Sequence, residues 1–355
     1  MKIGITGSQG YIGSKLLPYL ESKGHACFGF DTGFFLDCTI YSSIKNNFVK
    51  KDVREITVSD IGDLDVLIHL AGIANDPFGK LEPSKVFDPV RDYTKKLAEM
   101  CKSIGVKFIF ASSCSIYGEA TSPLLDEASI PNPVTPYSIN KLQSENDLEA
   151  LADKHFSPIA LRLSTLFGMS PRIRLDMAIN MFVGMAHTKG EIVLSSTGEQ
   201  WRPFVHINDV CEAFRMAAES SYDEGKLLVL NIGSDSNNIT VFDVAKMVAS
   251  KFDNCKVYRL VDNPEFDNSL LKDEKLQDGV DKRNYIVSFK KMDNYFPNFR
   301  CSWSLERGIE DIKLNFEHIG LTSEIFQDSK YYRLQYLDYL YMAKKIDKDM
   351  YWTKI

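Results

Sequence analysis

The chain has 355 residues, of which 44% are hydrophobic and 25% charged, so it can bury one large core or two modest ones. This composition excludes disorder over most of the length. The net charge of -6 argues against nucleic acid as the main partner, because basic patches drive that kind of binding.

Strands and helices alternate along the first half of the chain. Short apolar runs predict strands at 3–6, 27–30, 66–71, 108–111 and 159–163, and helices are expected from the glycine-rich turn to 23, at 84–104 and at 137–154. Strands separated by helices imply right-handed crossovers and a parallel sheet. The sequence therefore predicts an α/β protein with a Rossmann-type doubly wound sheet.

The pattern loosens after about residue 165. Helices are expected at 176–188, 209–220, 240–252 and 303–316, with a short strand within 166–205 and one more strand at 228–232. A polar loop at 262–284 and an aromatic helical tail at 329–343 complete the prediction. We expect residues 1–165, joined by 206–233, to form a dinucleotide-binding domain. Residues 166–205 and 234–315 would form a smaller C-terminal substrate-binding domain, followed by a helical extension over 316–355.

Three glycines follow the first strand directly and open a helix. Gly7 permits the tight turn, Gly10 lets the backbone approach a pyrophosphate, and Gly13 lets the helix pack against the strand. Asp31 ends the next strand, where a carboxylate accepts from a ribose 2′-hydroxyl and repels a 2′-phosphate. The spacing GxxGxxG with Asp31 therefore predicts NAD as the cofactor in preference to NADP.

A second motif, Tyr137-Ser138-Ile139-Asn140-Lys141, begins a predicted helix. Residues i and i+4 lie on one face of a helix, and an ammonium beside a phenol lowers the phenol pKa from about 10 towards neutrality. Tyr137 is then a base for a sugar hydroxyl. Ser112 and Ser113 end the preceding strand, at the edge of the sheet where ligands bind in this architecture.

Together these motifs resemble the extended short-chain dehydrogenase/reductases, in the NAD-dependent nucleotide-sugar epimerase/dehydratase family. The resemblance covers roughly residues 1–315 and rests on GSQGYIG (7–13), Asp31, KDV (51–53), HLAG (69–72), SSCSIYGE (112–119), PYSINK (136–141), LRLSTLFG (161–168) and RPFVHINDV (202–210).

The resemblance implies a role for each matching residue. Ser113, Tyr137 and Lys141 would be the catalytic residues, with Lys141 also bonding the nicotinamide ribose. The cofactor would be bound by Gly7, Gly10, Tyr11, Ile12, Gly13, Asp31, Asp52, Val53, Leu70, Ala71 and Gly72. The substrate, a nucleotide-diphosphate sugar, would be bound by Ser113, Thr165, Arg172, Asn180, Arg202 and Arg283, with the last two as a diphosphate clamp.

Two residues narrow the reaction within this resemblance. The similar 4,6-dehydratases carry Asp-Glu after the catalytic Ser/Thr, and here those positions are Cys114 and Ser115, which disfavours dehydration. Enzymes related to fucose synthesis place a cysteine base at the position of Ser115, so Cys114 is one residue away and is interpreted as a structural thiol. What remains supports epimerisation at C4. A dehydrogenase or a 4-keto reductase needs the same residues, and a non-catalytic NAD-binding protein is the least favoured alternative.

Ser170-Pro171-Arg172-Ile173-Arg174-Leu175-Asp176 resembles a stretch found in enzymes of surface-polysaccharide pathways. The resemblance also implies a homodimer through the helices at 84–104 and 137–154, where Leu97, Met100, Cys101 and Ile104 form one apolar stripe.

Seven scattered cysteines without a CxxC pair indicate neither a disulfide scaffold nor a metal site. No apolar run reaches the ~20 residues that span a bilayer, and no signal peptide is visible, so we expect a cytoplasmic protein without a membrane partner.

Overall fold

A computed structural model describes residues 1–41, 48–73, 83–120, 122–262 and 283–353. Its centre is a seven-stranded sheet in which every pair of neighbours is parallel, as the sequence predicts. The strand order is β10-β6-β5-β4-β1-β2-β3. The strands are β1 (Lys2–Thr6), β2 (Ala26–Asp31), β3 (Phe48–Lys50), β4 (Val66–His69), β5 (Lys107–Ser113), β6 (Ile159–Leu163) and β10 (Leu228–Ile232).

The strand order reverses between β1 and β4. From β1 the chain builds outward through β2 and β3, and then crosses back to place β4 on the other side of β1. Loops that leave the carboxyl ends of two such strands turn away from each other, and ligands bind in the crevice between them. Thr6 and His69 pair across this point, so the cofactor crevice is expected beside them.

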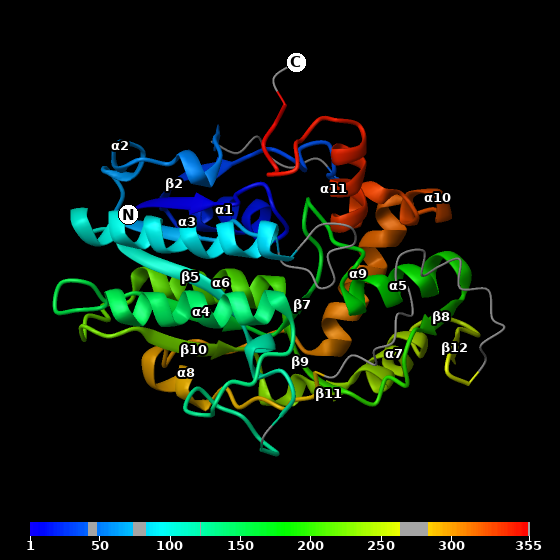
Figure 1. Cartoon of the computed structure of the whole chain (residues 1–355). Helices are drawn as coiled ribbons and strands as arrows, with labels where there is room; N and C mark the ends of the chain where they lie inside the picture. Colours follow the sequence, from blue (N-terminus) through cyan, green and yellow to red (C-terminus); the bar gives the residue numbers. More distant parts are fainter. Residues whose placement is uncertain (42–47, 74–82, 121, 263–282, 354–355) are drawn as a thin grey trace.

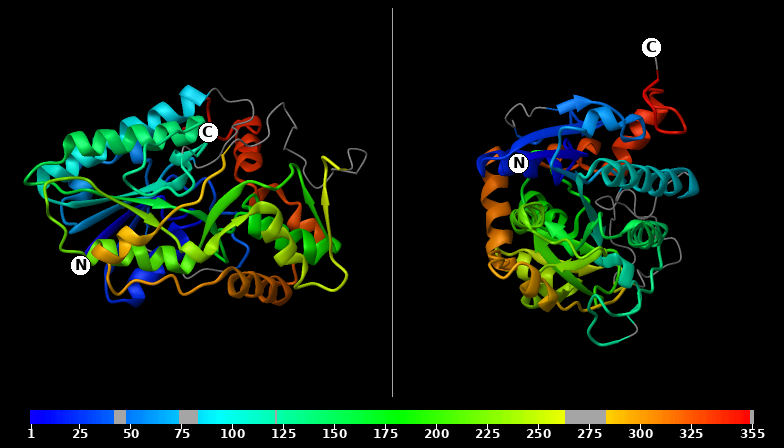
Figure 2. Two further views of the ribbon diagram at one scale, coloured as in Figure 1. Left: turned by 90° about the horizontal axis from the view of Figure 1, so that it is seen from below. Right: turned by 90° about the vertical axis from the view of Figure 1, so that its left-hand side faces the viewer.

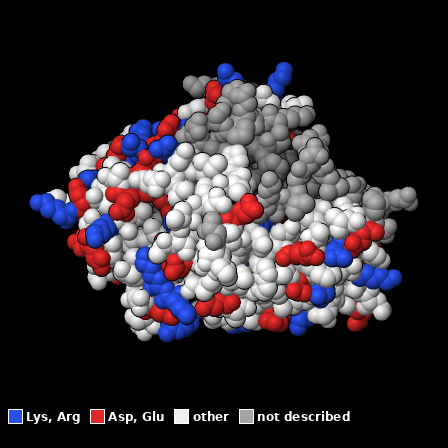
Figure 3. All heavy atoms as spheres, turned by 60° about the horizontal axis from the view of Figure 1, so that its bottom comes forward, with Lys and Arg blue, Asp and Glu red and all other residues white. Residues whose placement is uncertain are grey.

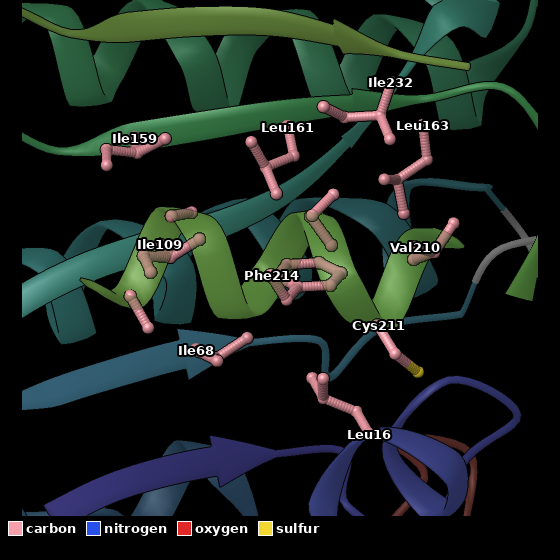
Figure 4. Close-up of a cluster of buried hydrophobic side chains, with 14 of the residues drawn as sticks. Leu16, Ile68, Ile109, Ile159, Leu161, Leu163, Val210, Cys211, Phe214 and Ile232 are labelled. Carbon is pink, nitrogen blue, oxygen red and sulfur yellow. The ribbon is translucent and has the colours of Figure 1, made fainter. Parts of the chain in front are cut away.

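Helices cover both faces of the sheet (Figures 1 and 2). On one face α3 (Pro83–Ile104) and α4 (Pro136–Leu151) pack side by side, and on the other lie α1 (Gly13–Ser22) and α6 (Ile207–Glu219). Figure 4 shows Val210 and Phe214 of α6 packed against Ile109, Leu161 and Ile232 of the sheet. These buried side chains come from the sheet and from the helix layer beside it. Their packing holds the edge of the sheet in place.

The apolar stripe expected at a dimer surface packs inside the protomer instead. Leu97 and Cys101 are 1% and 0% exposed, and Met100 and Ile104 pack against the same cluster with Phe108. The helical spacing was read correctly, but the stripe covers the sheet of its own chain. It therefore gives no support to a second subunit.

A second core lies beyond the carboxyl edge of the sheet. It is built from α5 (Ala178–Lys189), α7 (Val241–Ala249) and α9 (Leu305–Ile319) against small sheets. One sheet has β7 (Thr165–Phe167), β9 (Trp201–His206) and β11 (Asn238–Thr240), and the other pairs β8 (Glu191–Leu194) with β12 (Lys256–Arg259). Of these strands, β7 carries the chain directly out of β6, so the two cores meet where the candidate site lies.

The C-terminal residues pack first against the second core and then form a small cluster with residues that follow β2. After α8 (Lys290–Tyr295) and α9 come α10 (Ser323–Phe326), a short 3-10 turn (Ser329–Tyr331) and α11 (Arg333–Met342). The expected helix over 329–343 is thus interrupted at Tyr332, whose backbone is extended. α11 (red in Figure 1) lies at the same end of the molecule as α5 and α9. No described helix is both long and apolar enough to cross a membrane.

Candidate active site

The glycine-rich turn between β1 and α1 is shaped by two close approaches. Gly7 has φ +70°, and a Cβ on it would lie 2.8 Å from the main-chain nitrogen of Ala71. A Cβ on Gly13 would lie 2.3 Å from the carbonyl oxygen of Gly7. At Gly10 that same oxygen, at 3.2 Å, is the single described atom within 4 Å. Ile12 caps α1 without a side-chain hydrogen bond, so no side chain covers the N-terminus of this helix, the kind of position that binds anions.

Asp31 lies beside this turn at the end of β2. Its Oδ2 accepts from the main-chain nitrogen of Gln9 at 2.9 Å, and its Oδ1 accepts from that of Gly33 at 2.8 Å. Burial raises the pKa of Asp31, and these two N–H donors act in the opposite direction. Each oxygen keeps a second lone pair, so the carboxylate is held by the backbone with acceptor capacity left for a ribose hydroxyl.

The other expected cofactor residues lie at the ends of neighbouring strands. Asp52 caps the 3-10 turn Val53–Glu55 and pairs with Arg54 at 2.6 Å. Leu70, Ala71 and Gly72 follow β4, and the main-chain nitrogen of Ala71 donates to Thr6 Oγ1 at 3.3 Å. The structure thus brings the residues after β1, β2, β3 and β4 to one edge, with the glycine turn in the middle.

Tyr137 and Lys141 lie in the first two turns of α4. Thr135 begins the helix with a capping box to Ser138, and Pro136 occupies the first turn, where its missing N–H costs nothing. Lys141 Nζ donates to the carbonyl oxygen of Ala111 at 2.7 Å and lies 5.7 Å from the centroid of the Tyr137 ring. Burial lowers the pKa of Lys141 to about 7, and the positive charge of Arg333 acts in the same direction.

Ser113 ends β5, two residues after Ala111, whose carbonyl oxygen accepts from Lys141. Its Oγ accepts from the main-chain nitrogen of Ser115 at 3.1 Å, and among the described residues no acceptor is recorded for its hydroxyl proton. Ser115 Oγ is buried and has no described partner. Ser113 is only partly buried, so its hydroxyl can bond a ligand, whereas Ser115 Oγ is enclosed by protein.

A buried ion pair lies beneath the strand end. Arg162 Nη2 and Glu145 Oε2 are 2.7 Å apart, and Glu145 also accepts from the Ser112 hydroxyl. Arg162 Nη1 donates to Tyr117 Oη at 3.0 Å. This network joins α4, β5, β6 and the turn after β5, and so fixes Ser113 relative to the helix that carries Tyr137.

Cys114 is unsuited to act as a base. It is 1% exposed, its Sγ contacts the carbonyl oxygen of Arg162 at 3.2 Å, and burial raises its pKa to about 12. A thiol reacts as its thiolate, which is not populated near neutrality at such a pKa. The geometry agrees with the interpretation of Cys114 as a structural thiol.

The expected substrate residues fall into two groups: one lies on or beside β9, and the other lies in or beside the loop before α5. Arg202 of β9 donates to the main-chain carbonyl oxygen of Arg283, so these two arginines lie together, and β9 pairs with the strand that carries Thr165. Arg172 is 2% exposed, in the loop before α5. Asn180 is fully buried, and its amide bonds Gly168, Tyr11 and Arg174. Direct contact of Asn180 with a diphosphate would require these bonds to be exchanged, and in this structure it positions the loop.

The C-terminal extension reaches this site. Its sequence predicts packing on the body of the protein or on a partner subunit, with a substrate lid as the less favoured alternative. Tyr137 packs against a cluster that includes Tyr336 and Leu337 of α11, and the Arg333 charge acts on both Tyr137 and Lys141. The helical spacing of Tyr332, Tyr336 and Tyr339 predicts a packed face but not the surface that it covers.

Comparisons with known proteins show the family of this chain. The family model "NAD dependent epimerase/dehydratase family" matches residues 3–233. A curated relative from Bacillus subtilis, described as an uncharacterized UDP-glucose epimerase, is 29% identical over 228 residues, 59% of this chain and 70% of its own.

Two solved structures share the fold. TunA, an NAD-dependent NDP-hexosamine 5,6-dehydratase of tunicamycin biosynthesis, has a TM-score of 0.75 and 22% identity, with 89% of this chain and 98% of that chain covered. The Bacillus cereus UDP-glucuronic acid 4-epimerase, in complex with UDP-glucuronic acid and NAD, has a TM-score of 0.71 and 24% identity, over 90% and 100% of the two chains. Because the family model spans well over half of the sequence, the chain belongs to the NAD-dependent epimerase/dehydratase family of extended short-chain dehydrogenase/reductase enzymes.

Proposed function

We propose that this enzyme is a nucleotide-sugar epimerase that acts at C4 by transient hydride transfer. The observation that carries the proposal is the position of Lys141: its Nζ lies 5.7 Å from the centroid of the Tyr137 ring and donates to the carbonyl oxygen of Ala111, two residues before Ser113 on β5. A hydroxyl donor, a phenol and an ammonium are the groups needed to take a proton from a sugar hydroxyl.

In this proposal the chain's residues handle the proton and hold the sugar. Tyr137 Oη takes the proton of the C4 hydroxyl, and Ser113 Oγ donates to the same oxygen as negative charge develops on it. Lys141, in its ammonium form, stabilises the phenolate of Tyr137. Bound NAD supplies the hydride acceptor and, when reduced, the donor. If the sugar turns within the site before Tyr137 returns the proton, the configuration at C4 is inverted without net redox change.

The residues present fit that cofactor. The turn at Gly7 and Gly13 leaves an uncovered backbone at the start of α1, and Asp31 keeps acceptor capacity beside it. We propose that Gly10, Tyr11 and Ile12 contact the pyrophosphate with their backbone, and that Asp52, Val53 and the segment Leu70–Gly72 enclose the adenosine and the nicotinamide ribose.

The nucleotide-sugar would lie on the other side of Tyr137. We propose that Arg202 and Arg283 bind its diphosphate, because the structure places them together and guanidinium groups match phosphate geometry. Thr165, at the start of β7, and Arg172, in the loop before α5, would contact the sugar. The resemblance of 170–176 to enzymes of surface-polysaccharide pathways supports the same substrate class.

Other reactions of the family need different groups or a different fate for the hydride. Dehydration is disfavoured because Cys114 and Ser115 occupy the positions of the acid and base, although a dehydratase is among the structures that share this fold. A dehydrogenase or 4-keto reductase remains the alternative, since Ser113, Tyr137 and Lys141 would serve it equally.

We also propose a division into two domains, a cytoplasmic location and a homodimer. The division into a dinucleotide-binding domain and a substrate-binding domain is supported by the two separate cores. A cytoplasmic location is supported by seven free cysteines. A homodimer through α3 and α4 is supported only by the family resemblance, and a monomeric mass by light scattering at micromolar concentration would refute it.

A panel of nucleotide sugars tests the proposed activity. The purified protein is incubated with NAD and UDP-glucose, UDP-glucuronic acid or UDP-N-acetylglucosamine, and absorbance at 340 nm is followed together with NMR of the products. An epimerase gives the C4 epimer with no lasting rise in absorbance. Stoichiometric NADH would instead establish the dehydrogenase, and loss of a hydroxyl would establish a dehydratase.

A further inference from the structure

Three arginine side chains gather inside the molecule at the candidate site: Arg172, Arg174 and Arg333. On the face in Figure 3, by contrast, the described basic and acidic side chains are interspersed. Arg174 pairs with Asp176 at 2.9 Å, whereas Nε and Nη1 of Arg333 and Nε of Arg172 are buried with no hydrogen-bond partner. Arg172 Nη1 donates to the carbonyl oxygen of Ile173, so three buried N–H groups are left that an anion would satisfy.

Two arginines meet at one aromatic ring. The guanidinium groups of Arg333 and Arg172 lie 6.0 and 4.5 Å from the centroid of Phe35, four residues after Asp31. The cluster that contains Phe35 also includes Tyr137 of α4. Asp31 marks the expected adenosine end of the cofactor and Tyr137 the nicotinamide end, so Arg333 lies along the stretch where a dinucleotide carries its pyrophosphate.

The C-terminal extension holds Arg333 there through several contacts. The main-chain nitrogen of Leu175 donates to the carbonyl oxygen of Tyr331 at 3.0 Å. This bond connects the residues before α11 to the loop that carries Arg172 and Arg174. Tyr336, Leu337 and Leu340 of α11 form a cluster with Cys38 and the aromatic residues that follow β2. Arg333 is thus the first residue of a helix whose apolar side is packed in place.

The end of the chain fastens the extension to the adenosine side. Trp352 Nε1 donates to the carbonyl oxygen of Thr32 at 2.6 Å, one residue after Asp31. Arg54 donates to the carbonyl oxygens of Asp349 and Met350, and its guanidinium lies 3.4 Å from the centroid of the Tyr351 ring. Because Thr32 follows Asp31 and Arg54 pairs with Asp52, these contacts place the end of the chain beside two of the expected cofactor residues.

We infer that the C-terminal extension is part of the cofactor site and that Arg333 binds a diphosphate there, that of NAD. The sugar substrate carries a diphosphate of the same chemistry. The position of Arg333 near Asp31 favours the cofactor, while Arg202 and Arg283 are available to the sugar. The inference rests on the NAD dependence of the family and not on the sugar chemistry, so it can fail while the proposed epimerase activity stands.

Binding measurements on the full chain test this inference. Arg333→Gln should weaken the binding of NAD and ADP-ribose by about 10- to 100-fold, the loss expected for a charge-assisted contact, and should leave adenosine unchanged. Arg333→Lys should restore part of the affinity. UDP binding to the NAD-saturated protein should be unaffected, and the exposed Arg300→Gln should change none of these values.

Two outcomes would overturn the inference. Unchanged affinity for NAD in a folded Arg333→Gln protein is the first. The second is a loss of affinity that does not follow the NAD diphosphate. An equal loss for adenosine would make the residue structural, and a loss confined to UDP would assign it to the sugar substrate. If the variant does not fold, hydrogen exchange on the wild-type protein decides: ADP-ribose must slow exchange in 333–342 and adenosine must not, and equal exchange with both ligands would refute the assignment.

Discussion

Removal of the buried carboxylate beneath the site should destabilise the protein strongly. Glu145 and Arg162 have side chains that are 4% and 6% exposed, and the guanidinium also bonds Tyr117 Oη. Glu145→Ala leaves the Arg162 charge buried without its carboxylate, and breaking a buried pair in this way costs about 3–5 kcal/mol. Since small proteins have ~5–15 kcal/mol of stability in total, this loss is a large fraction.

Urea denaturation of the NAD-free protein measures this loss. The double variant Glu145→Ala/Arg162→Met should recover part of it, because the unpaired charge is then gone. Asp293→Ala, which breaks the exposed pair with Arg300, should cost about 1 kcal/mol or less. If Glu145→Ala cost no more than Asp293→Ala, the ion pair would not be what joins α4 to the strand end.

Three further predictions concern the candidate site itself. Tyr137→Phe should lower kcat by roughly 10²–10⁴ with substrate binding nearly unchanged, because the ring is kept and only the proton acceptor is lost. Cys114→Ser is the control and should keep most of the activity in steady-state kinetics. If Tyr137→Phe kept its turnover and Cys114→Ser lost it, the chemistry would belong to the cysteine. Asp31→Ala should weaken NAD binding by about 1–3 kcal/mol and reduce the preference over NADP, and titration with both nucleotides checks this, with stronger NADP binding by the wild type as the contrary result. Burial lowers the pKa of Lys141 to about 7 from an ordinary value of about 10.4, so the unfolded chain binds the proton more strongly, and the free energy of unfolding falls as the pH drops from about 10.4 to about 7. Urea denaturation of the NAD-free protein at several pH values should show this loss in the wild type relative to Lys141→Met. A difference in stability between the two proteins that does not vary with pH would contradict the prediction.

The sequence predicts the sheet and its ligand edge well because their signals are local. Buried parallel strands read as continuous apolar runs, and the strands at 159–163 and 228–232 occur at their expected bounds. The short strands β3, β7, β11 and β12 were not predicted, because three or four residues carry no periodicity of their own. The expected loop at 262–284 lies largely outside the described residues.

The site was predictable where a motif fixes the spacing along one element. Tyr137 and Lys141 share a helix, so their proximity follows from the sequence alone. Arg333 lies more than 150 residues after Arg174 in the chain, and nothing in the order of residues says that α11 returns to the same site. The apolar stripe of Leu97 and Cys101 shows the converse limit, since a periodic face reveals that it is buried but not whether it packs against its own chain.

The proposed hydride transfer at C4 is tested most directly with a substrate that carries deuterium at that carbon. The nucleotide sugar that gives a C4 epimer in the panel is prepared in this form, converted in ordinary water, and the product is examined by NMR. We predict full retention of deuterium at C4, because the hydride leaves and returns through the bound cofactor without exchange with solvent. Replacement of that deuterium by hydrogen from water, or deuterium found at a neighbouring carbon, would contradict the mechanism.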